Sequence, residues 1–128
     1  MEKAQGPDIW HQQTPGLAEA EKLLTAAIRQ TPDTGPPRWS LGVLLARQER
    51  YMEALPHFAM LVAPPVADYR AYRHLGLIYD KLGQTGKSEE YLETYRREKR
   101  KAQVEKIARK EMEKQLNKFG QAGALNRP

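Results

Sequence analysis

The segment Gly83-Gln84-Thr85-Gly86-Lys87-Ser88 ends in the residue types that hold the phosphates of a nucleotide. A phosphate-binding loop has the pattern G-x-x-x-x-G-K-[ST] and follows a β-strand, so that its backbone N–H groups surround the phosphates. The first glycine of this pattern falls on Lys81, and the residues before it have a helical pattern. We therefore interpret the segment as a turn between two helices, where glycine is common, and not as a nucleotide site.

No other group of side chains in the sequence has the types and spacing that catalysis or metal binding requires. His11, His57 and His74 lie far apart, and the chain has no cysteine, whereas helical zinc sites place two histidines four residues apart. The carboxylate pairs fall on polar helix surfaces, where a catalytic acid lacks the burial that shifts its pKa. No serine lies in a G-x-S-x-G turn, and no nucleophile has an evident base. We expect a protein that is not an enzyme and that uses no cofactor and no metal.

The composition indicates which elements the chain can build. Its 128 residues are typical of one small domain, since domains have about 100–200 residues. Alanine and leucine contribute 29 residues and valine and isoleucine only 8, so helix formers far outnumber residues suited to strands. We expect an all-α protein. No apolar run reaches the length of a signal sequence or a membrane span, so we also expect it to be soluble and cytoplasmic.

The net charge of +5 belongs to one segment near the C-terminus. Residues 1–95 hold 10 basic and 12 acidic side chains, whereas residues 96–118 hold 10 basic and 4 acidic ones. Most of the chain is therefore close to neutral, unlike a globally basic nucleic-acid-binding protein.

Small and apolar residues recur at a spacing of 34. The clearest set is Leu41-Gly42, Ala54 and Phe58, and 34 residues later it is matched by Leu75-Gly76, Ser88 and Leu92. Ala54 and Phe58 also have counterparts 34 residues earlier, Ala20 and Leu24. This pattern resembles the tetratricopeptide repeat, a 34-residue helix-turn-helix unit that reads W-x2-L-G-x2-Y, then A-x3-F, then P. The segment Tyr72-x2-Leu75-Gly76-x2-Tyr79 is the best match.

The resemblance implies a tetratricopeptide-like superhelix of about two and a half repeats over residues 15–98, preceded by an irregular segment at residues 1–14. In such a stack Gly42 and Gly76 lie where the two helices of a unit cross most closely, and larger side chains such as Phe58 and Leu92 fill the space around them. The resemblance also implies a non-catalytic interaction module, such as a scaffold, an adaptor or an assembly chaperone.

Arrays of this family hold an extended peptide or a partner helix in a concave groove, which the first helix of each unit lines. The resemblance therefore implies a partner-binding surface made of Trp39, Val43, Arg47, Arg70, Arg73, His74, Leu77 and Lys81. Cations beside aromatic and aliphatic side chains suit a protein or peptide that carries carboxylates and a large apolar anchor. In the alternative interpretation these arginines are ordinary solvated charges and Trp39 belongs to the core.

Residues 99–119 are expected to extend the last repeat helix as a basic helix, because no proline or glycine occurs from Lys87 to Phe119. Its apolar row is thin and consists of Val104, Ala108, Met112 and Leu116, joined by Ile107 and Phe119. A polar helix of this kind can cap a repeat array and contact a partner. The alternative is a helix that oligomerises or binds an anionic surface, either membrane or nucleic acid. Nucleic acid is the less favoured of these, because no aromatic side chain in residues 96–118 could stack on bases. Residues 120–128 are expected to form a disordered tail.

Overall fold

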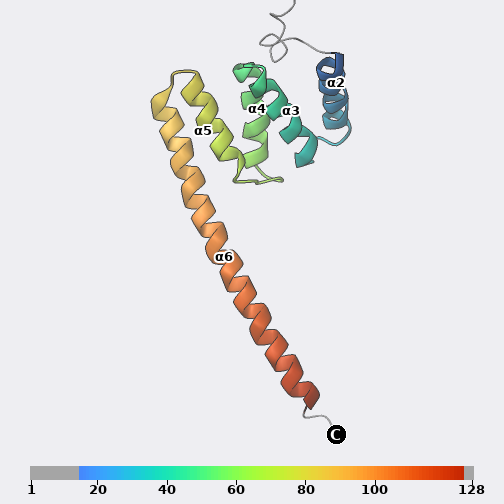
Figure 1. The fold of residues 1–128 in the computed structure, drawn as a ribbon, viewed down its shortest axis with the longest axis vertical. Helices are drawn as coiled ribbons and strands as arrows, with labels where there is room; N and C mark the ends of the chain where they lie inside the picture. Colours follow the sequence, from blue (N-terminus) through green and yellow to red (C-terminus); the bar gives the residue numbers. More distant parts are fainter. Residues whose placement is uncertain (1–14, 126–128) are drawn as a thin grey trace, which may run out of the picture. The chain divides into compact units, whose positions relative to one another are not determined.

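The computed structural model describes residues 15–125, which form five helices and contain no strand. The helices are α2 (Pro15–Gln30), α3 (Gly35–Arg47), α4 (Tyr51–Val62), α5 (Ala71–Lys81) and α6 (Thr85–Leu125) (Figure 1). The expected all-α class is therefore confirmed for this part of the chain. The irregular segment expected at residues 1–14 lies outside the described residues.

The chain divides into two units, Met1–Tyr95 and Arg96–Pro128. The division falls inside α6, so the first part of this helix belongs to one unit and the rest to the other. We predicted a boundary slightly later, between residues 98 and 99. None of the helices in residues 15–125 combines the length and the apolar character needed to cross a bilayer.

Consecutive helices of the first unit pack against one another, α2 on α3, α3 on α4 and α4 on α5. Their shared core is formed by eight buried apolar side chains: Leu41, Leu45, Ala54, Phe58, Leu61, Ala71, Leu75 and Ile78. The start of α6 packs on α5 through tyrosines, since the rings of Tyr79 and Tyr91 are stacked with their centroids 5.4 Å apart. Pro56 lies inside α4, and the helix continues past it.

The α3–α4 and α5–α6 turns have the same backbone hydrogen bonds, one repeat apart. In each turn two N–H groups donate to carbonyls three and five positions earlier, at 2.9–3.0 Å: Glu49 to Ala46 and Arg50 to Leu45, then Gly83 to Asp80 and Gln84 to Tyr79. Gly83 has a φ of +79°, a left-handed conformation that glycine adopts at little cost. The segment around Gly83 is thus the predicted turn between two helices.

The two helix crossings recur at the same period. A Cβ atom added to Gly42 would lie 2.9 Å from Cζ of Phe58, and one added to Gly76 would lie 2.7 Å from Cδ2 of Leu92. Real Cβ atoms do not approach other side chains so closely. The predicted role of both glycines, close approach of two helices beside a large side chain, is confirmed.

The C-terminal end of α6 differs from the prediction. We expected the helix to end at residue 119 and residues 120–128 to be disordered, but α6 continues to Leu125. The prediction is wrong for residues 120–125 because a glycine within a helix costs only about 1 kcal/mol relative to alanine. Gly120 and Gly123 stand among good helix formers, glutamine, alanine and leucine, which sustain the helix around them. Residues 126–128 lie outside the described part.

Candidate functional site

The predicted partner-binding residues lie on α3 and α5, except for Arg70, which immediately precedes α5. Six of them form three pairs, each one repeat apart: Trp39 with Arg73, Val43 with Leu77, and Arg47 with Lys81. Because α3 and α5 each precede an equivalent turn, the members of a pair occupy equivalent places on the two helices. The structure distributes these residues between two surface pockets, and Arg73 lines neither.

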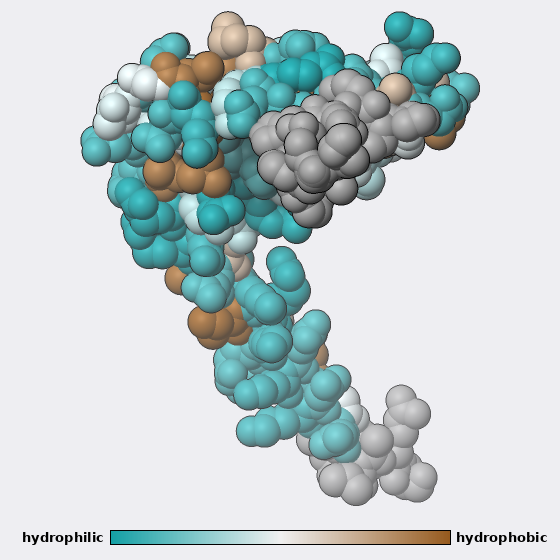
Figure 2. Space-filling model, turned by 45° about the horizontal axis from the view of Figure 1, so that its top comes forward, coloured by the Kyte–Doolittle hydropathy of each residue, from teal (hydrophilic) through white to brown (hydrophobic). Residues whose placement is uncertain are grey.

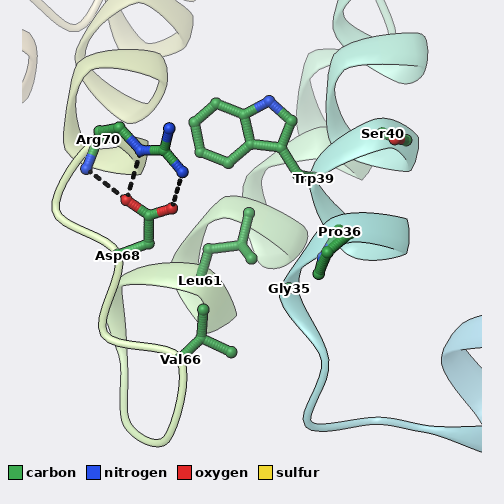
Figure 3. A pocket seen from close by; sticks show the side chains of 8 residues that line it. All are labelled: Gly35, Pro36, Trp39, Ser40, Leu61, Val66, Asp68 and Arg70. Carbon is green, nitrogen blue, oxygen red and sulfur yellow. Dashed lines mark hydrogen bonds and ion pairs between the residues drawn. The ribbon is translucent and has the colours of Figure 1, made fainter.

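The first pocket, which we call the tryptophan pocket, has a volume of about 480 Å³. It is lined by Gly35, Pro36, Trp39, Ser40, Leu61, Val66, Asp68 and Arg70. Figure 3 shows Arg70 and Asp68 on one side of it and the α3 residues Gly35, Pro36 and Ser40 on the other, with the ring of Trp39 beside the guanidinium group. Its surface is mainly apolar, and its two charged groups are neighbours.

Arg70 is paired within the chain. Its Nε and Nη2 atoms donate to Oδ1 and Oδ2 of Asp68 at 2.9 and 2.6 Å, and its backbone N–H donates to Oδ1 at 3.0 Å. These hydrogen bonds hold the pKa of the Asp68 carboxyl below its usual value. The guanidinium carbon also lies 5.3 Å from the centre of the Trp39 ring, a cation–π distance. The charge of Arg70, which we expected to be available to a partner, is therefore already balanced by Asp68.

Trp39 belongs both to the core and to the pocket. Its ring meets Phe58 edge-on at 5.8 Å and His74 edge-on at 4.9 Å between centroids, and it packs against the buried core. It remains partly exposed and lines the tryptophan pocket. The structure therefore confirms that Trp39 packs against the core, and its place on a partner-binding surface stays a prediction.

His74 is held as an aromatic ring and not as a cation. It is half-buried and stacks on Phe58 with the centroids 4.7 Å apart and the planes 3° from parallel. Burial, with the nearby charge of Arg73 as a smaller cause, lowers the pKa of His74 below its ordinary value of 6.5. The shift favours the uncharged imidazole at pH 7, and the ring contributes to the lining of the second pocket.

The second pocket, which we call the cationic pocket, brings together five of the predicted residues. Its volume is about 300 Å³, and it is lined by Val43, Ala46, Arg47, Tyr51, His74, Leu77, Ile78 and Lys81. Leu77 is 41% exposed, which is high for a large apolar side chain on a packed helix. Within the described residues Arg47 and Lys81 form no ion pair, and no carboxylate lines the pocket.

Sequence reasoning missed Asp68 and Val66, which lie between α4 and α5 and so outside the helices that the repeat assigns to the groove. The pairing has a local signal in the sequence, because an aspartate two residues before an arginine can accept a hydrogen bond from the backbone N–H of that arginine. This signal indicates that Arg70 has an acidic neighbour.

Within residues 15–125 no group of three or more histidine, cysteine, aspartate or glutamate side chains is placed to hold a metal ion. Comparison with known protein families and with curated proteins finds no match for this chain.

Proposed function

We propose that this chain is a tetratricopeptide-like, non-catalytic interaction module whose α3–α5 face binds a partner segment carrying carboxylates and a large apolar side chain. One observation carries the proposal. The cationic pocket offers Arg47 and Lys81, without ion-pair partners in the described chain, beside the exposed apolar side chain of Leu77. The expected roles as scaffold, adaptor or assembly chaperone share this step.

The likeness to a tetratricopeptide superhelix has structural support beyond the sequence pattern. The two turns repeat their hydrogen bonds one period apart, and Gly42 and Gly76 make equivalent close approaches. In a stack of equivalent helix pairs the first helices, here α3 and α5, face the same side. The cationic pocket lies mainly between these two helices, whereas the tryptophan pocket lies between α3 and the segment that joins α4 to α5. Both pockets include α3, one of the helices on which the family holds its ligands.

The chemistry of the cationic pocket favours an acidic ligand with an apolar anchor. A carboxylate that accepts hydrogen bonds from Arg47 or Lys81 forms a charge-assisted contact, which is about twice as strong as a neutral one. An apolar side chain placed on Leu77 and Val43 removes further surface from water, at about 25 cal/mol per Å² of apolar area. A ligand that supplies only charge or only an apolar group gains one of these contributions.

Peptide selection tests the proposal. A displayed library of random twelve-residue peptides is selected on the full chain, and the enriched peptides are then measured on Leu77→Asp and on Lys106→Glu as a matched surface control. We expect enrichment of peptides that contain acidic and large apolar residues, loss of binding to Leu77→Asp and unchanged binding to Lys106→Glu. The proposal fails if nothing is enriched or if Leu77→Asp binds the peptides as well as the control does, provided that both variants keep the helical circular dichroism of the original chain.

A second candidate function rests on the part of α6 that belongs to the second unit. Five of its large apolar side chains are between 61% and 81% exposed: Val104, Ile107, Met112, Leu116 and Phe119. At about 100° per residue, four lysines fall on the helix face opposite this row: Lys99, Lys106, Lys110 and Lys114. Figure 2 shows this segment as a largely hydrophilic surface interrupted by separate hydrophobic side chains. A basic amphipathic helix of this kind binds anionic lipid surfaces.

Vesicle sedimentation tests this second function independently of the groove. The full chain should sediment with vesicles of mixed anionic and zwitterionic phospholipids but not with purely zwitterionic ones, and Met112→Asp with Leu116→Asp should abolish the effect. Equal recovery with both kinds of vesicle, or none with either, contradicts it.

A further inference from the structure

The two pockets of the groove differ in net charge, and the difference is set by which arginines are already paired. The inference drawn from this difference rests on the proposed function, because it concerns which ligand residues the same groove selects. Asp68 accepts both side-chain hydrogen bonds of Arg70 in the tryptophan pocket, so that pocket has no net charge. The cationic pocket contains Arg47 and Lys81 and no carboxylate, so its charge is positive.

The tryptophan pocket is built for an uncharged residue. A ligand carboxylate at this site would either displace Asp68 from Arg70 or bind the remaining N–H groups of a guanidinium whose charge Asp68 already balances, and either gains less than contact with an unpaired cation. Pro36, Val66 and the ring of Trp39 present apolar surface instead. An apolar side chain gains from this surface without disturbing the ion pair.

The cationic pocket has the opposite preference. Arg47 and Lys81 are exposed and stand one repeat apart on α3 and α5, so a ligand that lies between these helices meets one cation from each. Leu77 and Val43 supply the apolar surface between them. An acidic residue next to an apolar one satisfies both parts of this lining.

The rings of Trp39 and His74 mark the division between the pockets. Trp39 lines one pocket and His74 the other, and their centroids are 4.9 Å apart. The pockets therefore adjoin across this ring pair. Two separate depressions of this kind accept two anchoring side chains, whereas a docked helix presents a continuous apolar row.

The distance between the pockets follows from the helices that line them. On α3, Trp39 lines the tryptophan pocket and Arg47, eight residues later, lines the cationic pocket. At α5, Arg70 lines the tryptophan pocket and Leu77, seven residues later, lines the cationic pocket. At a helical rise of about 1.5 Å per residue, these separations correspond to roughly 11 Å. An extended peptide covers roughly 11 Å in three to four residues, and a helix needs seven or eight.

We propose that the groove binds an extended acidic peptide through two anchors three or four residues apart: an uncharged apolar residue in the tryptophan pocket, and an acidic residue beside an apolar one in the cationic pocket. Arg47 and Lys81 determine the preference for a negatively charged ligand residue. Arg70, although its guanidinium carbon lies 5.3 Å from the centre of the Trp39 ring, does not contribute to this preference.

Synthetic peptides test the spacing and the charge preference. The probes are fluorescein-labelled twelve-residue peptides in a glycine–serine background. Each carries one leucine as the first anchor and a Leu-Glu pair as the second, and the two anchors are separated by two to eight residues. Binding of each peptide to the full chain is measured by fluorescence anisotropy. A matching set carries Leu-Lys in place of Leu-Glu. We expect the tightest binding at separations of three and four, and roughly tenfold weaker binding of the lysine set.

Two double variants identify the cations that cause the preference for glutamate peptides over lysine peptides. Arg47→Glu with Lys81→Glu should reverse the preference, so that the lysine peptides bind more tightly than the glutamate ones. Asp68→Asn with Arg70→Gln removes both members of the ion pair without changing net charge and should keep the preference for glutamate, whatever its effect on overall affinity. Arg97→Glu with Lys101→Glu controls for a general change in net charge.

The outcomes separate the inference from the function on which it rests. The groove function stands if the peptides bind and Leu77→Asp abolishes their binding. The two-anchor model is nevertheless wrong if Asp68→Asn with Arg70→Gln removes the preference for glutamate peptides. It is also wrong if the tightest binding occurs at a separation of seven or eight residues. If no peptide of either set binds, or if binding survives Leu77→Asp, both are wrong.

Discussion

Glu49 and Gly83 occupy the same place in two turns that lie one repeat apart, and both have a left-handed backbone, with φ of 61° and 79°. For glycine this conformation carries no steric penalty, whereas for a residue with a Cβ atom it costs about 1–2 kcal/mol. The turn geometry is therefore retained at Glu49 by the surrounding hydrogen bonds and not by the residue itself.

Exchanging the residue type at these positions should have opposite effects. Glu49→Gly should raise the free energy of unfolding by ~0.5–1 kcal/mol, because the relief of backbone strain exceeds the cost of the added freedom of the unfolded chain. Gly83→Ala should lower it by about 1 kcal/mol. Urea unfolding followed by circular dichroism measures both. A destabilising Glu49→Gly would mean that the two turns are not equivalent.

The approach of Gly76 to Leu92 predicts a second effect on stability. Gly76→Ala places a Cβ atom 2.7 Å from the Leu92 side chain and 3.2 Å from the backbone oxygen of Ser88, which should cost ~1–3 kcal/mol and lower the thermal midpoint by several degrees. Gly86→Ala is the matched control, since nothing lies within 4 Å of a Cβ atom there. Similar midpoints for the two variants would contradict the close crossing of α5 and α6.

Arg50 ties α2 to the rest of the first unit. Its Nη1 and Nη2 atoms donate to the two carboxylate oxygens of Glu21 at 2.8 and 3.0 Å, and these bonds lower the pKa of Glu21. Both side chains are about 30% exposed, so solvent screens the pair. Glu21→Gln should therefore cost only about 1 kcal/mol.

Amide hydrogen exchange locates this effect. In Glu21→Gln the amides of α2 should exchange faster, while those of α5 should not change. Glu19→Gln, a change on the same helix outside the pair, is the control. Equal exchange in α2 for the two variants would show that the pair does not hold the helix.

The burial of His74 predicts how stability depends on pH. Its pKa is lowered in the folded protein, so between that lowered value and about 6.5 the unfolded chain binds more protons than the folded one. The free energy of unfolding should then be highest above pH 6.5 and fall as the pH drops below it, by at most ~1.4 kcal/mol per pH unit for each such group. The pKa of His57 is also lowered by burial, so His57 adds to the same slope.

Urea unfolding at pH 7.5, 6.5 and 5.5 measures this slope. His74→Phe should make it shallower, and His57→Gln with His74→Phe should flatten it. The carboxylates with lowered pKa values, such as Asp68 and Glu21, act only at lower pH, near and below 4.5. A slope between pH 5.5 and 6.5 that the double variant keeps would contradict the burial of the two imidazoles.

The elements and crossings of the first unit were predictable because they depend on spacing. Gly42 and Gly76 could be placed beside Phe58 and Leu92 from the repeat alone, since each glycine serves a local contact between neighbouring helices. The charge balance of the two pockets was not predictable in this way. Asp68 pairs with Arg70 from a loop that the repeat pattern does not specify. Burial lowers the pKa of His74, and this burial depends on the packed structure. The end of α6 was missed because glycine was read as a stop, although its cost within a helix is small.

Binding of the partner segment to the proposed α3–α5 face can be mapped through the amide chemical shifts of the uniformly ¹⁵N-labelled full chain. A peptide with leucine and Leu-Glu anchors four residues apart is titrated into the protein, and the amide shifts are followed residue by residue. The proposal predicts that the largest shifts fall on α3 and α5, around Trp39, Val43, Arg47, Leu77 and Lys81. Shifts confined to residues 96–121 of α6 or to α2, or no shifts at saturating peptide, would contradict it.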